Sequence, residues 1–393
     1  MNIFYISTLS SRQGVERVYK CSGRNPGFAV QKFSRLIVKG LQENGHKVVA
    51  LSSPPIGLGD ISRGCPKFRN EIEDGVEYRY APQVLLPGIK HIVVFFHMFF
   101  TVLFWGLRNR RDKAIVCDVL CVSACMGALL ATKLNGVRSV AVVTDIYGLM
   151  VGGRKNLVSI LAKKFHDRYV MSFDRYVLLT EQMNAVVNPH GRPHIVMEAL
   201  CDDSLVAAPA QPVQKACPRT LLYAGGLHEK YGLKMLAEGF LKANLDARLV
   251  IYGDGPFAGM LQRMAEADSR IEYRGVASNE EVMEEERKAS LLVNPRFTTE
   301  AFTKYSFPSK NMEYMASGTP LLTTKLPGMP EEYYPYVFLF EEETVDGYAS
   351  AIQKVLSLSD AELCAKGAKA RDFVLTVKNN RRQAERILDL MKA

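Results

Sequence analysis

The sequence predicts an α/β protein with two Rossmann-like, doubly wound domains that face each other across a cleft. Two observations carry this prediction. Short apolar strands alternate with helical segments along the 393 residues, and the alternation lapses into Ala, Pro, Gln and Cys at 199–220 before it restarts. Such alternation is typical of parallel sheets covered by helices on both faces. We therefore expect one domain over 1–200, a second over 201–371, and a helical tail over 372–393.

The first half opens with a strand at 2–7, and a polar loop follows from Thr8 to about Gly27. A helix is predicted over 28–43 because its apolar residues recur at helical spacing and Asn44-Gly45 comes directly after them. The further strands expected in this half are 46–51, 114–118, 139–144, 175–179 and 194–197.

The second half repeats the pattern with a new set of strands. They are expected at 220–224, 248–252, 271–273, 290–293, 320–323 and 337–340, with helices between them. Ligands of doubly wound sheets bind outside the carboxyl ends of the strands. The turns that follow these strands are therefore where a site is expected.

Composition and charge limit the class of protein. Hydrophobic residues make up 48% and charged residues 23% of the chain, which excludes a mostly disordered protein. Residues 1–200 carry 26 Lys and Arg against 14 Asp and Glu, whereas residues 201–393 carry 24 against 27. A basic half attracts anionic lipid, a phosphorylated substrate or nucleic acid, but no nucleic-acid motif occurs. The first 20 residues lack a signal-peptide pattern, so we expect a cytoplasmic protein.

The eight cysteines indicate a reducing compartment and no zinc ribbon, since no CxxC pair occurs. Cys117, Cys121 and Cys125 are spaced by four residues, which would place them on one face of a helix. However, 114–117 reads as the end of a buried strand, where free cysteine acts as a small hydrophobe. No histidine or carboxylate completes the set, so no metal site is expected there.

One stretch, 90–105, is strongly apolar (KHIVVFFHMFFTVLFW) and is followed by a basic cluster of Arg108, Arg110, Arg111 and Lys113. It is short for a membrane span. Two interpretations stay open. The stretch is either a buried helix of the first domain or a face that dips into an anionic membrane surface, with the cluster at headgroup level.

Three stretches of the second half carry chemistry, and two of them are glycine turns. Gly225 and Gly226 follow a strand and precede a helix, as in turns that bring a phosphate to the backbone and the next helix N-terminus. Gly253 lies in a similar strand–turn–helix segment. Each signal is weak, because glycines also form ordinary turns between strands and helices.

The third stretch, Asn294-Pro295-Arg296 followed by 305–320, is the most informative. Pro308 suits the first turn of a helix, and Gly318 suits the position just past its end. The polar residues that then share one face are Ser309, Lys310, Glu313 and Ser317. The residues left to pack inward are Met312, Met315 and Ala316.

The chemistry of this predicted helix has two interpretations. Its N-terminus, with Ser309 and Lys310, offers free N–H groups and an ammonium, which suits a diphosphate. Glu313, one turn later, can accept two hydrogen bonds from the vicinal diol of a ribose. Alternatively, Lys310 and Glu313 form a solvated i,i+3 ion pair worth a few tenths of a kcal/mol. Spacing alone does not choose between the two.

The run SFPSKNMEYMASGTPLLTT, with YAGGL and YGDGP before it, resembles the C-terminal domain of family 4 glycosyltransferases, which have the GT-B fold. In the first half, IFYIST, VVTDIYG and YVLLTEQMN more diffusely resemble bacterial polysaccharide-assembly members of that family. The likeness covers essentially the whole chain. It implies that Glu313 binds the ribose of the donor nucleotide, and that the terminal helix from about Asp372 packs back toward the first domain.

The sequence departs from the family pattern around the donor. Tyr305 stands where the family often has a glutamate that contacts the donor sugar, and Glu300 lies further upstream. Gly226 and Tyr231 stand where the family often has an Arg and a Lys that grip the diphosphate. A leaving diphosphate still needs cations, and the expected substitutes are Lys230, Arg296 and Lys310.

In the first domain, Thr144 precedes Asp145 where the family commonly has a histidine. By resemblance the reaction retains the anomeric configuration, and Asp145 then orients the acceptor or the sugar. In an inverting enzyme it would be a candidate general base. The alternative is an N-cap on a loop.

These observations predict a glycosyltransferase that moves a sugar from a nucleotide diphosphate-sugar to a saccharide, expected to be lipid-linked, in cell-surface polysaccharide synthesis. No cofactor is expected, and no metal, since no DxD-like pair occurs. The expected catalytic residues are Asp145, Arg296 and Lys310. The expected donor-binding residues are Gly225, Gly226, Lys230, Gly253, Tyr305, Ser309, Lys310 and Glu313.

Two other functions stay open, and no oligomeric state is expected from the sequence. One is a non-hydrolysing sugar-nucleotide epimerase, which shares the two-domain architecture but needs His and carboxylate groups that the motifs lack, apart from His228. The other is a donor-binding relative that has lost turnover, which the departures at Gly226 and Tyr305 favour.

Overall fold

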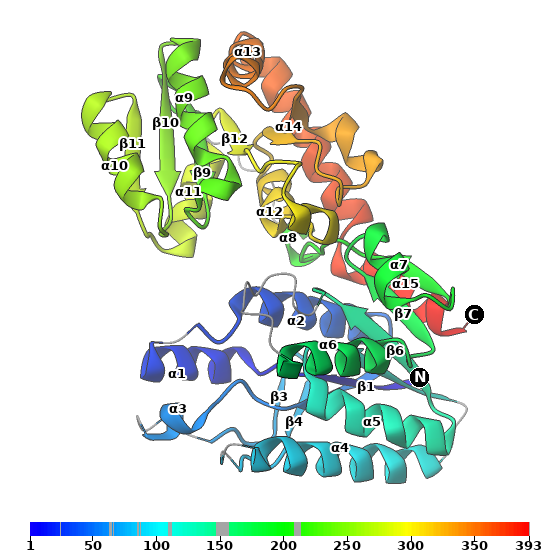
Figure 1. The fold of residues 1–393 in the computed structure, drawn as a ribbon. Helices are drawn as coiled ribbons and strands as arrows, with labels where there is room; N and C mark the ends of the chain where they lie inside the picture. Colours follow the sequence, from blue (N-terminus) through cyan, green and yellow to red (C-terminus); the bar gives the residue numbers. More distant parts are fainter. Residues whose placement is uncertain are drawn as a thin grey trace. The chain divides into compact units, whose positions relative to one another are not determined.

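The computed structural model describes the chain except for residues 24, 63–64, 66, 85, 87, 109–111, 147–156, 208–213 and 393. The chain divides into two compact units. The first comprises Met1–Leu200 with Asn380–Ala393, and the second comprises Cys201–Asn379. Each unit holds one sheet covered by helices (Figure 1), and the two are described separately below.

The first unit has an eight-stranded sheet in the order β3-β4-β2-β1-β5-β6-β7-β8. All neighbouring strands are parallel except the β3–β4 hairpin. The strands are β1 Asn2–Ser7, β2 Lys47–Ser52, β3 Glu71–Glu73, β4 Val76–Tyr80, β5 Lys113–Asp118, β6 Arg138–Val143, β7 Arg175–Leu178 and β8 His194–Val196. The predicted strands of this half are confirmed to within one residue. The β3–β4 hairpin was not predicted from the sequence.

The helices of the first unit are α1 Arg12–Ser22, α2 Phe28–Glu43, α3 Leu58–Ser62, α4 Ile89–Leu107, α5 Val122–Asn135, α6 Leu157–Val170, η2 Glu181–Met183, α7 Asn184–Val187 and α15 Asn380–Lys392. The helix predicted over 28–43 is confirmed. The loop predicted from Thr8 to Gly27 is wrong, because it contains α1. The Ser11 hydroxyl caps this helix by accepting the Gly14 N–H, Val15 and Val18 are buried, and Gly23 ends it in the left-handed region.

Helices cover both faces of this sheet, and successive side chains of β1 contact helices on opposite faces. The Tyr5 hydroxyl reaches Ser34 of α2 on one face, at 3.0 Å. Phe4, pointing the other way, stacks on Trp105 of α4 with 4.0 Å between ring centroids. The hydrophobic core on the α2 side also includes Ile387 and Leu388 of α15.

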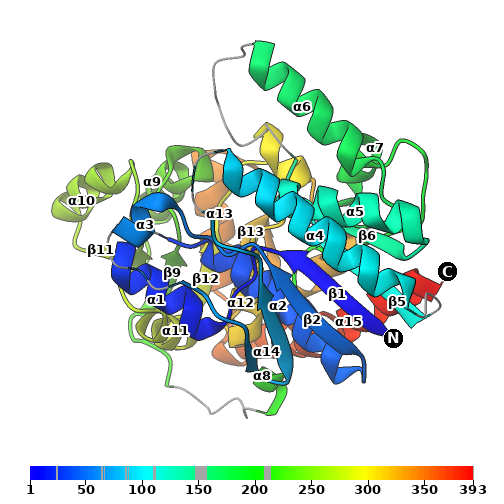
Figure 2. The ribbon, with the colours of Figure 1, turned by 90° about the horizontal axis from the view of Figure 1, so that it is seen from below.

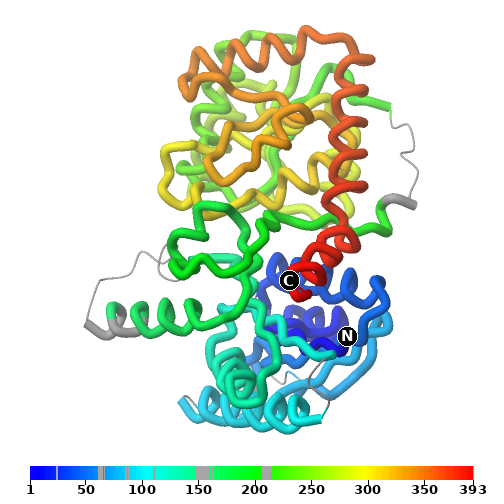
Figure 3. The backbone as a smooth tube through the Cα atoms, turned by 90° about the vertical axis from the view of Figure 1, so that its right-hand side faces the viewer, coloured from blue at the N-terminus to red at the C-terminus, as the bar shows by residue number. Residues whose placement is uncertain are grey.

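The predicted helical tail is two helices rather than one. α14 (Asp360–Val377) ends before Lys378-Asn379, and α15 begins at Asn380 (Figure 3). α14 belongs to the second unit, whereas α15 packs on α2 of the first. The packing is close, since a Cβ on Gly40 would lie 2.2 Å from the Asn380 carbonyl oxygen.

The second unit has a six-stranded, all-parallel sheet in the order β11-β10-β9-β12-β13-β14. Its strands are β9 Arg219–Ala224, β10 Ala247–Tyr252, β11 Ile271–Gly275, β12 Leu291–Asn294, β13 Leu321–Thr324 and β14 Phe338–Phe340. The sequence predicted these six strands to within two residues. The inner strands β10, β9, β12 and β13 are short and mostly buried, as expected for strands covered on both faces, whereas the edge strand β11 carries Glu272 and Arg274.

The helices of this unit are α8 Ser204–Ala207, η3 Glu229–Tyr231, α9 Leu233–Ala243, α10 Ala258–Ala267, α11 Asn279–Lys288, η4 Ala301–Tyr305, α12 Ser309–Ser317, η5 Glu331–Tyr336, α13 Val345–Leu356 and α14. α9 and α13 pack together on one face of the sheet, where Phe240 and Tyr348 are fully buried. α12 and α14 pack together in the same unit.

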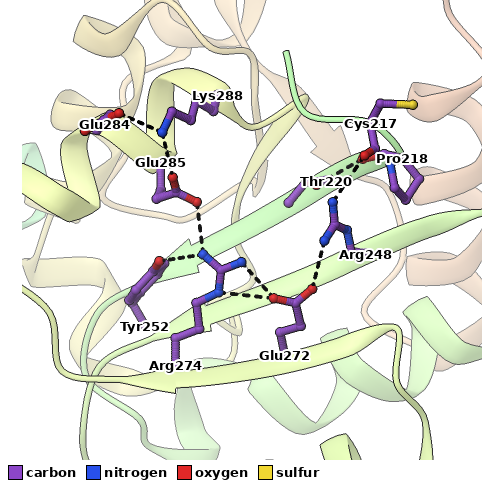
Figure 4. Close-up of polar contacts among 10 residues, drawn as sticks. All are labelled: Cys217, Pro218, Thr220, Arg248, Tyr252, Glu272, Arg274, Glu284, Glu285 and Lys288. Carbon is purple, nitrogen blue, oxygen red and sulfur yellow. Dashed lines mark hydrogen bonds and ion pairs between the residues drawn. The ribbon is translucent and has the colours of Figure 1, made fainter. Parts of the chain in front are cut away.

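A polar network ties the edge of this sheet to α11 (Figure 4). The Arg274 guanidinium donates to the Tyr252 hydroxyl at 2.9 Å, to Glu285 at 3.0 Å and to Glu272 at 2.8 Å. Arg248 bonds the other oxygen of Glu272 at 3.2 Å. These contacts outweigh the effect of burial, so they raise the pKa of Arg274 and lower that of Glu272, and both groups are ionised at neutral pH.

Candidate active site

The strand order of the second sheet defines where a ligand can bind. Along the sheet the strands stand third, second, first, fourth, fifth and sixth in chain order, so the connections change direction between β9 and β12. In open parallel sheets the crevice lies at this switch point, outside the carboxyl ends of the strands. The segments that follow β9 and β12 are therefore the first candidates for a site.

The two predicted glycine turns lie against each other at this edge. Gly253, after β10, has φ +133°, and a Cβ there would lie 1.8 Å from the Gly225 carbonyl oxygen, after β9. Glycine is thus required at position 253 by both conformation and packing. At Gly226 a Cβ would meet only ordinary contacts, the nearest at 3.5 Å, so packing does not require glycine there.

The turn after β9 is held by a buried tyrosine. The Tyr223 hydroxyl donates to the Gly226 carbonyl oxygen at 2.9 Å, and burial raises the pKa of Tyr223 to about 12. The hydroxyl therefore keeps its proton throughout the physiological range. It fixes the backbone of the turn at which the sequence predicts a phosphate.

Two of the three expected cations gather on an aromatic pair. The Arg296 guanidinium, two residues after β12, lies 4.6 Å from the ring centroid of Tyr231. The Lys230 ammonium lies 5.2 Å from the ring of Phe302, which contacts Tyr231 edge-on at 6.2 Å. The structure therefore brings together Lys230 of η3 and Arg296 of the loop after β12, each stacked on an aromatic ring.

The helix predicted from the third motif is present as α12. It begins at Ser309, and Pro308 lies at the position before its first turn rather than within it. Gly318 ends it with φ +81°, as expected. The inward residues Met312, Met315 and Ala316 are buried, and Ser309 is exposed.

Lys310 and Glu313 form the ion pair that the sequence left as an alternative. The Lys310 ammonium lies 2.9 Å from the Glu313 carboxylate and 3.9 Å from that of Glu286 on α11. Glu286 is buried, whereas Lys310 and Glu313 are about one-third exposed. The Lys310 ammonium is thus shared between two carboxylates, so it is less available to a phosphate than a cation that lies away from acidic side chains.

Two further residues of α12 position the helix, and the sequence analysis gave them no role. The Tyr314 hydroxyl accepts the Ala224 N–H at 2.8 Å and donates to the Ala224 carbonyl oxygen at 3.1 Å. The buried amides of Asn294 and Asn311 bond each other at 2.5 Å, which joins the end of β12 to the first turn of α12. In the sequence, these residues could have been found only by their positions within the third motif.

Tyr305, expected at the donor sugar, is the last residue of η4 and is half-buried. The loop before it is anchored by Glu343, whose carboxylate accepts the Thr298 N–H at 2.9 Å. Glu300 directly precedes η4 and lies five residues before Tyr305. The role expected for Tyr305 at the donor sugar stays a prediction.

Asp145 lies in the first unit, just after the carboxyl end of β6. It is half-buried, its carboxylate accepts the Ile146 N–H at 2.7 Å, and burial raises its pKa. The N-cap alternative falls on residues 147–156, which lie outside the described residues. Arg110 and Arg111 of the expected basic cluster also lie outside them.

The first sheet has its own buried carboxyl at a strand end, which the sequence analysis missed. Asp118 ends β5, accepts the Leu120 N–H at 3.1 Å, and has its pKa raised to about 6 by burial. Cys117 and Cys125 are buried nearby, and none of the eight cysteines forms a disulfide. Within the part of the chain that the structure describes, no three His, Cys, Asp or Glu side chains are grouped as metal ligands.

Comparison with known proteins relates both the sequence and the fold to one class. Residues 218–358 match the family described as glycosyl transferases group 1. This matched segment spans β9 to the end of α13 and contains every candidate residue of the second unit. None of the curated protein sequences matches the chain significantly.

Solved structures share the fold over the whole chain at low sequence identity. A glycosyltransferase from Rickettsia africae is 14% identical with a TM-score of 0.65, covering 100% of this chain and 97% of that one. A sucrose-phosphate synthase from Thermosynechococcus elongatus is 14% identical with a TM-score of 0.63, covering 100% and 98%. HepE from Anabaena, in complex with UDP, is 12% identical with a TM-score of 0.61, covering 100% of both chains.

The fold is thus that of the GT-B glycosyltransferases, with two Rossmann-like sheets. Residues 218–358, within the second unit, match the group 1 glycosyl transferases, and the solved structures relate the whole chain to this class by fold. The fold class predicted from the sequence is confirmed, and so is the resemblance to glycosyltransferases; the assignment to family 4 stays a prediction.

Proposed function

We propose that the chain transfers a sugar from a nucleotide diphosphate-sugar to a hydroxyl group of a saccharide acceptor. The observation that carries the proposal is the convergence of two glycine turns, an Arg–Lys–aromatic cluster and the N-terminal turn of α12 at the switch point of an all-parallel sheet. A diphosphate needs backbone N–H groups and cations, and a ribose needs an acceptor of two hydrogen bonds. The UDP bound by Anabaena HepE, which shares the fold, supports a nucleotide donor.

We assign the diphosphate to Arg296 and Lys230, and the ribose to Glu313. The two cations stand on Tyr231 and Phe302. Within the part of the chain that the structure describes, neither of them forms an ion pair with a carboxylate, whereas Lys310 lies between two carboxylates. Lys310 then orients Glu313 toward the diol and adds to the field at the N-terminus of α12. Gly225, Gly226, Gly253 and Ser309 supply backbone N–H groups and close approach.

In the reaction, the bond between the anomeric carbon and the diphosphate oxygen breaks, and a bond to the acceptor oxygen forms. Negative charge grows on the diphosphate, where Arg296 and Lys230 stabilise it; such preorganised groups are each worth about 3 kcal/mol. We propose retention at the anomeric carbon, with the acceptor proton passing to the leaving diphosphate oxygen. Asp145 orients the acceptor or the sugar.

We further propose that the acceptor is a lipid-linked saccharide of a cell-surface polysaccharide, handled on the cytoplasmic side of a membrane. The excess of Lys and Arg in residues 1–200 supports an anionic acceptor such as a polyprenyl diphosphate conjugate. No metal is assigned a role.

A thermal-shift screen of nucleotide diphosphate-sugars tests the donor assignment. A donor at 1,000 times its dissociation constant should stabilise the protein by about 4 kcal/mol. Glu313→Gln keeps the shape of the side chain but removes its negative charge, which weakens the two hydrogen bonds that it would accept from the ribose. We therefore expect the affinity for the nucleotide sugar to fall about 10- to 100-fold. Glu284→Gln, on the exposed face of α11, is the matched control and should leave the shift unchanged. An unchanged shift in Glu313→Gln would remove the ribose assignment, and no shift with any nucleotide sugar would remove the proposed donor.

A further inference from the structure

Helix α4 presents a continuous apolar face to solvent. Its 19 residues contain no Asp or Glu, and four of them, Val94, Met98, Val102 and Gly106, are buried. The exposed residues recur every three or four positions, with 46–62% of each side chain exposed, and we call them the α4 face: Ile89, Ile92, Phe96, Phe100, Phe104 and Leu107. The rings of Phe96, Phe100 and Phe104 stack along the helix, with centroids 6.3 and 6.1 Å apart.

The opposite side of α4 is anchored in the first unit. A Cβ on Gly127 of α5 would lie 2.2 Å from the Phe95 carbonyl oxygen, so the two helix backbones touch. The Asn135 amide of α5 donates to the Val102 carbonyl oxygen at 3.0 Å. Figure 2 shows α4 and α5 lying side by side along this side of the unit. The helix is therefore a fixed part of the domain. It is buried on one side only, so the interpretation as a wholly buried helix is wrong, and the interpretation as a membrane-facing surface stays a prediction.

The structure describes one helix with the length and composition to cross a membrane, and it is α4. At about 1.5 Å per residue it is about 28 Å long, close to the thickness of a bilayer core. Spanning would require it to leave α5, Asn135 and the Trp105–Phe4 stack. Lying in the plane of the interface requires no such separation, because the exposed side alone faces lipid.

The size and charge of the surface also favour a bilayer over a second copy of the chain. Each of the three half-exposed phenylalanine rings leaves roughly 100 Å² of apolar surface in solvent. With Ile89, Ile92 and Leu107 included, the α4 face offers roughly 500–600 Å² of apolar surface. A stable homodimer buries about 800 Å² or more per partner. Arg108, exposed directly after α4, and the basic excess of residues 1–200 complement anionic headgroups and repel a second copy.

We infer that the α4 face inserts, parallel to the membrane plane, into the boundary between headgroups and acyl chains of an anionic lipid bilayer. The basic residues of the first unit draw the protein to the surface, and the phenylalanine ladder holds it there. The inference uses no residue of the donor site, so it stands or falls separately from the proposed donor.

Flotation with vesicles of phosphatidylethanolamine and phosphatidylglycerol tests the inference. At about 25 cal/mol per Å², burying the roughly 100 Å² of each ring is worth up to about 60-fold in partitioning, so Phe96→Ser, Phe100→Ser and Phe104→Ser combined should weaken vesicle binding by more than about 100-fold. Ile72→Ser, at a 75% exposed residue of β3, is the control and should bind as the wild type does. Salt should weaken wild-type binding only in part, because the apolar contribution is not screened.

Tryptophan depth measurements distinguish insertion in the plane from spanning. Trp105 is the single tryptophan, so Phe96→Trp, Phe100→Trp and Phe104→Trp are each made with Trp105→Phe, which keeps the stack on Phe4. Quenching by brominated lipids should place all three at one shallow depth. A difference approaching the roughly 12 Å between positions 96 and 104 would overturn the inference in favour of a span.

Two further results would also overturn it. One is a wild-type protein that stays with the soluble fraction at low salt while its thermal unfolding shows a folded chain. The other is a dimer in lipid-free solution that the triple serine variant dissociates, which would assign the α4 face to a second copy. Retained thermal unfolding of the triple variant shows that lost flotation is not lost folding.

Discussion

The hydroxyl of Tyr314 is expected to contribute more to stability than any other polar group of α12. Gly225 N–H bonds to β10 at Tyr252, so the backbone groups of Ala224, one residue earlier, point toward the β12 side. The pairing of β9 with β12 ends before Ala224, at Leu222. The Tyr314 hydroxyl fills the gap, and it satisfies both the N–H and the carbonyl oxygen of Ala224.

Tyr314→Phe removes this oxygen and leaves two buried backbone groups unpaired. Each unpaired group costs about 1–3 kcal/mol, so the second unit should lose about 3 kcal/mol of its free energy of unfolding. For a unit of this size the melting temperature should fall by about 6–12 °C. The ring keeps its volume, so no cavity contributes.

The assay is calorimetry of the full chain, with hydrogen exchange at residues 219–226 reporting on the second unit alone. Tyr334→Phe is the matched control in the same unit, because its hydroxyl makes one long bond of 3.5 Å at a half-exposed position. That variant should change stability by less than about 0.5 kcal/mol. The reasoning is refuted if Tyr314→Phe costs no more than Tyr334→Phe.

Two further variants probe the glycine turn and the buried carboxyl. Gly253→Ala places a Cβ 1.8 Å from the Gly225 carbonyl oxygen. It should lower the free energy of unfolding of the second unit by more than about 2 kcal/mol and abolish donor-induced stabilisation. The control is Gly259→Ala in α10, whose Cβ meets nothing within 4 Å and should raise the free energy of unfolding by about 0.5–1 kcal/mol. Asp118 holds its proton to about pH 6 in the folded state, so this carboxyl lowers the free energy of unfolding as pH rises from about 4, by about 3 kcal/mol above pH 6. Asp118→Asn should remove that decline in urea unfolding at pH 4.5 and 7.5, and a variant that follows the wild type at both pH values would contradict the assignment.

Most strands were predicted correctly because a buried strand is recognisable from its own apolar residues, without knowledge of the segments that pack on it. Strands buried on both faces need uninterrupted Val, Ile and Leu, and a run such as 48–51 is visible without any partner. The β3–β4 hairpin was missed because it lies at a sheet edge with alternating polar residues. α1 was missed because it has few apolar residues and is polar overall, so its sequence resembles that of a loop. Ser11 and Gly23 nevertheless mark its two ends.

For the candidate site, the sequence predicted the limits of helix α12 but not the partners of its side chains. Pro308 and Gly318 act on the backbone next to them, so the limits of α12 follow from the sequence. The partners of its side chains come from elsewhere in the chain: Glu286 reaches Lys310 from α11, and Ala224 meets Tyr314 across a sequence separation of 90 residues. No local pattern encodes such pairings.

The sequence by itself determined the alternation of strands and helices, the glycine turns and the limits of the donor-side helix, because each depends on residues close together in the chain. Only the tertiary structure decided that Arg296 stands on the ring of Tyr231, that Lys310 lies between two carboxylates, and that α4 is buried on one side and exposed on the other. The physical reason is that the protonation, exposure and partners of a side chain depend on which segments fold against it. Those segments come from distant parts of the chain.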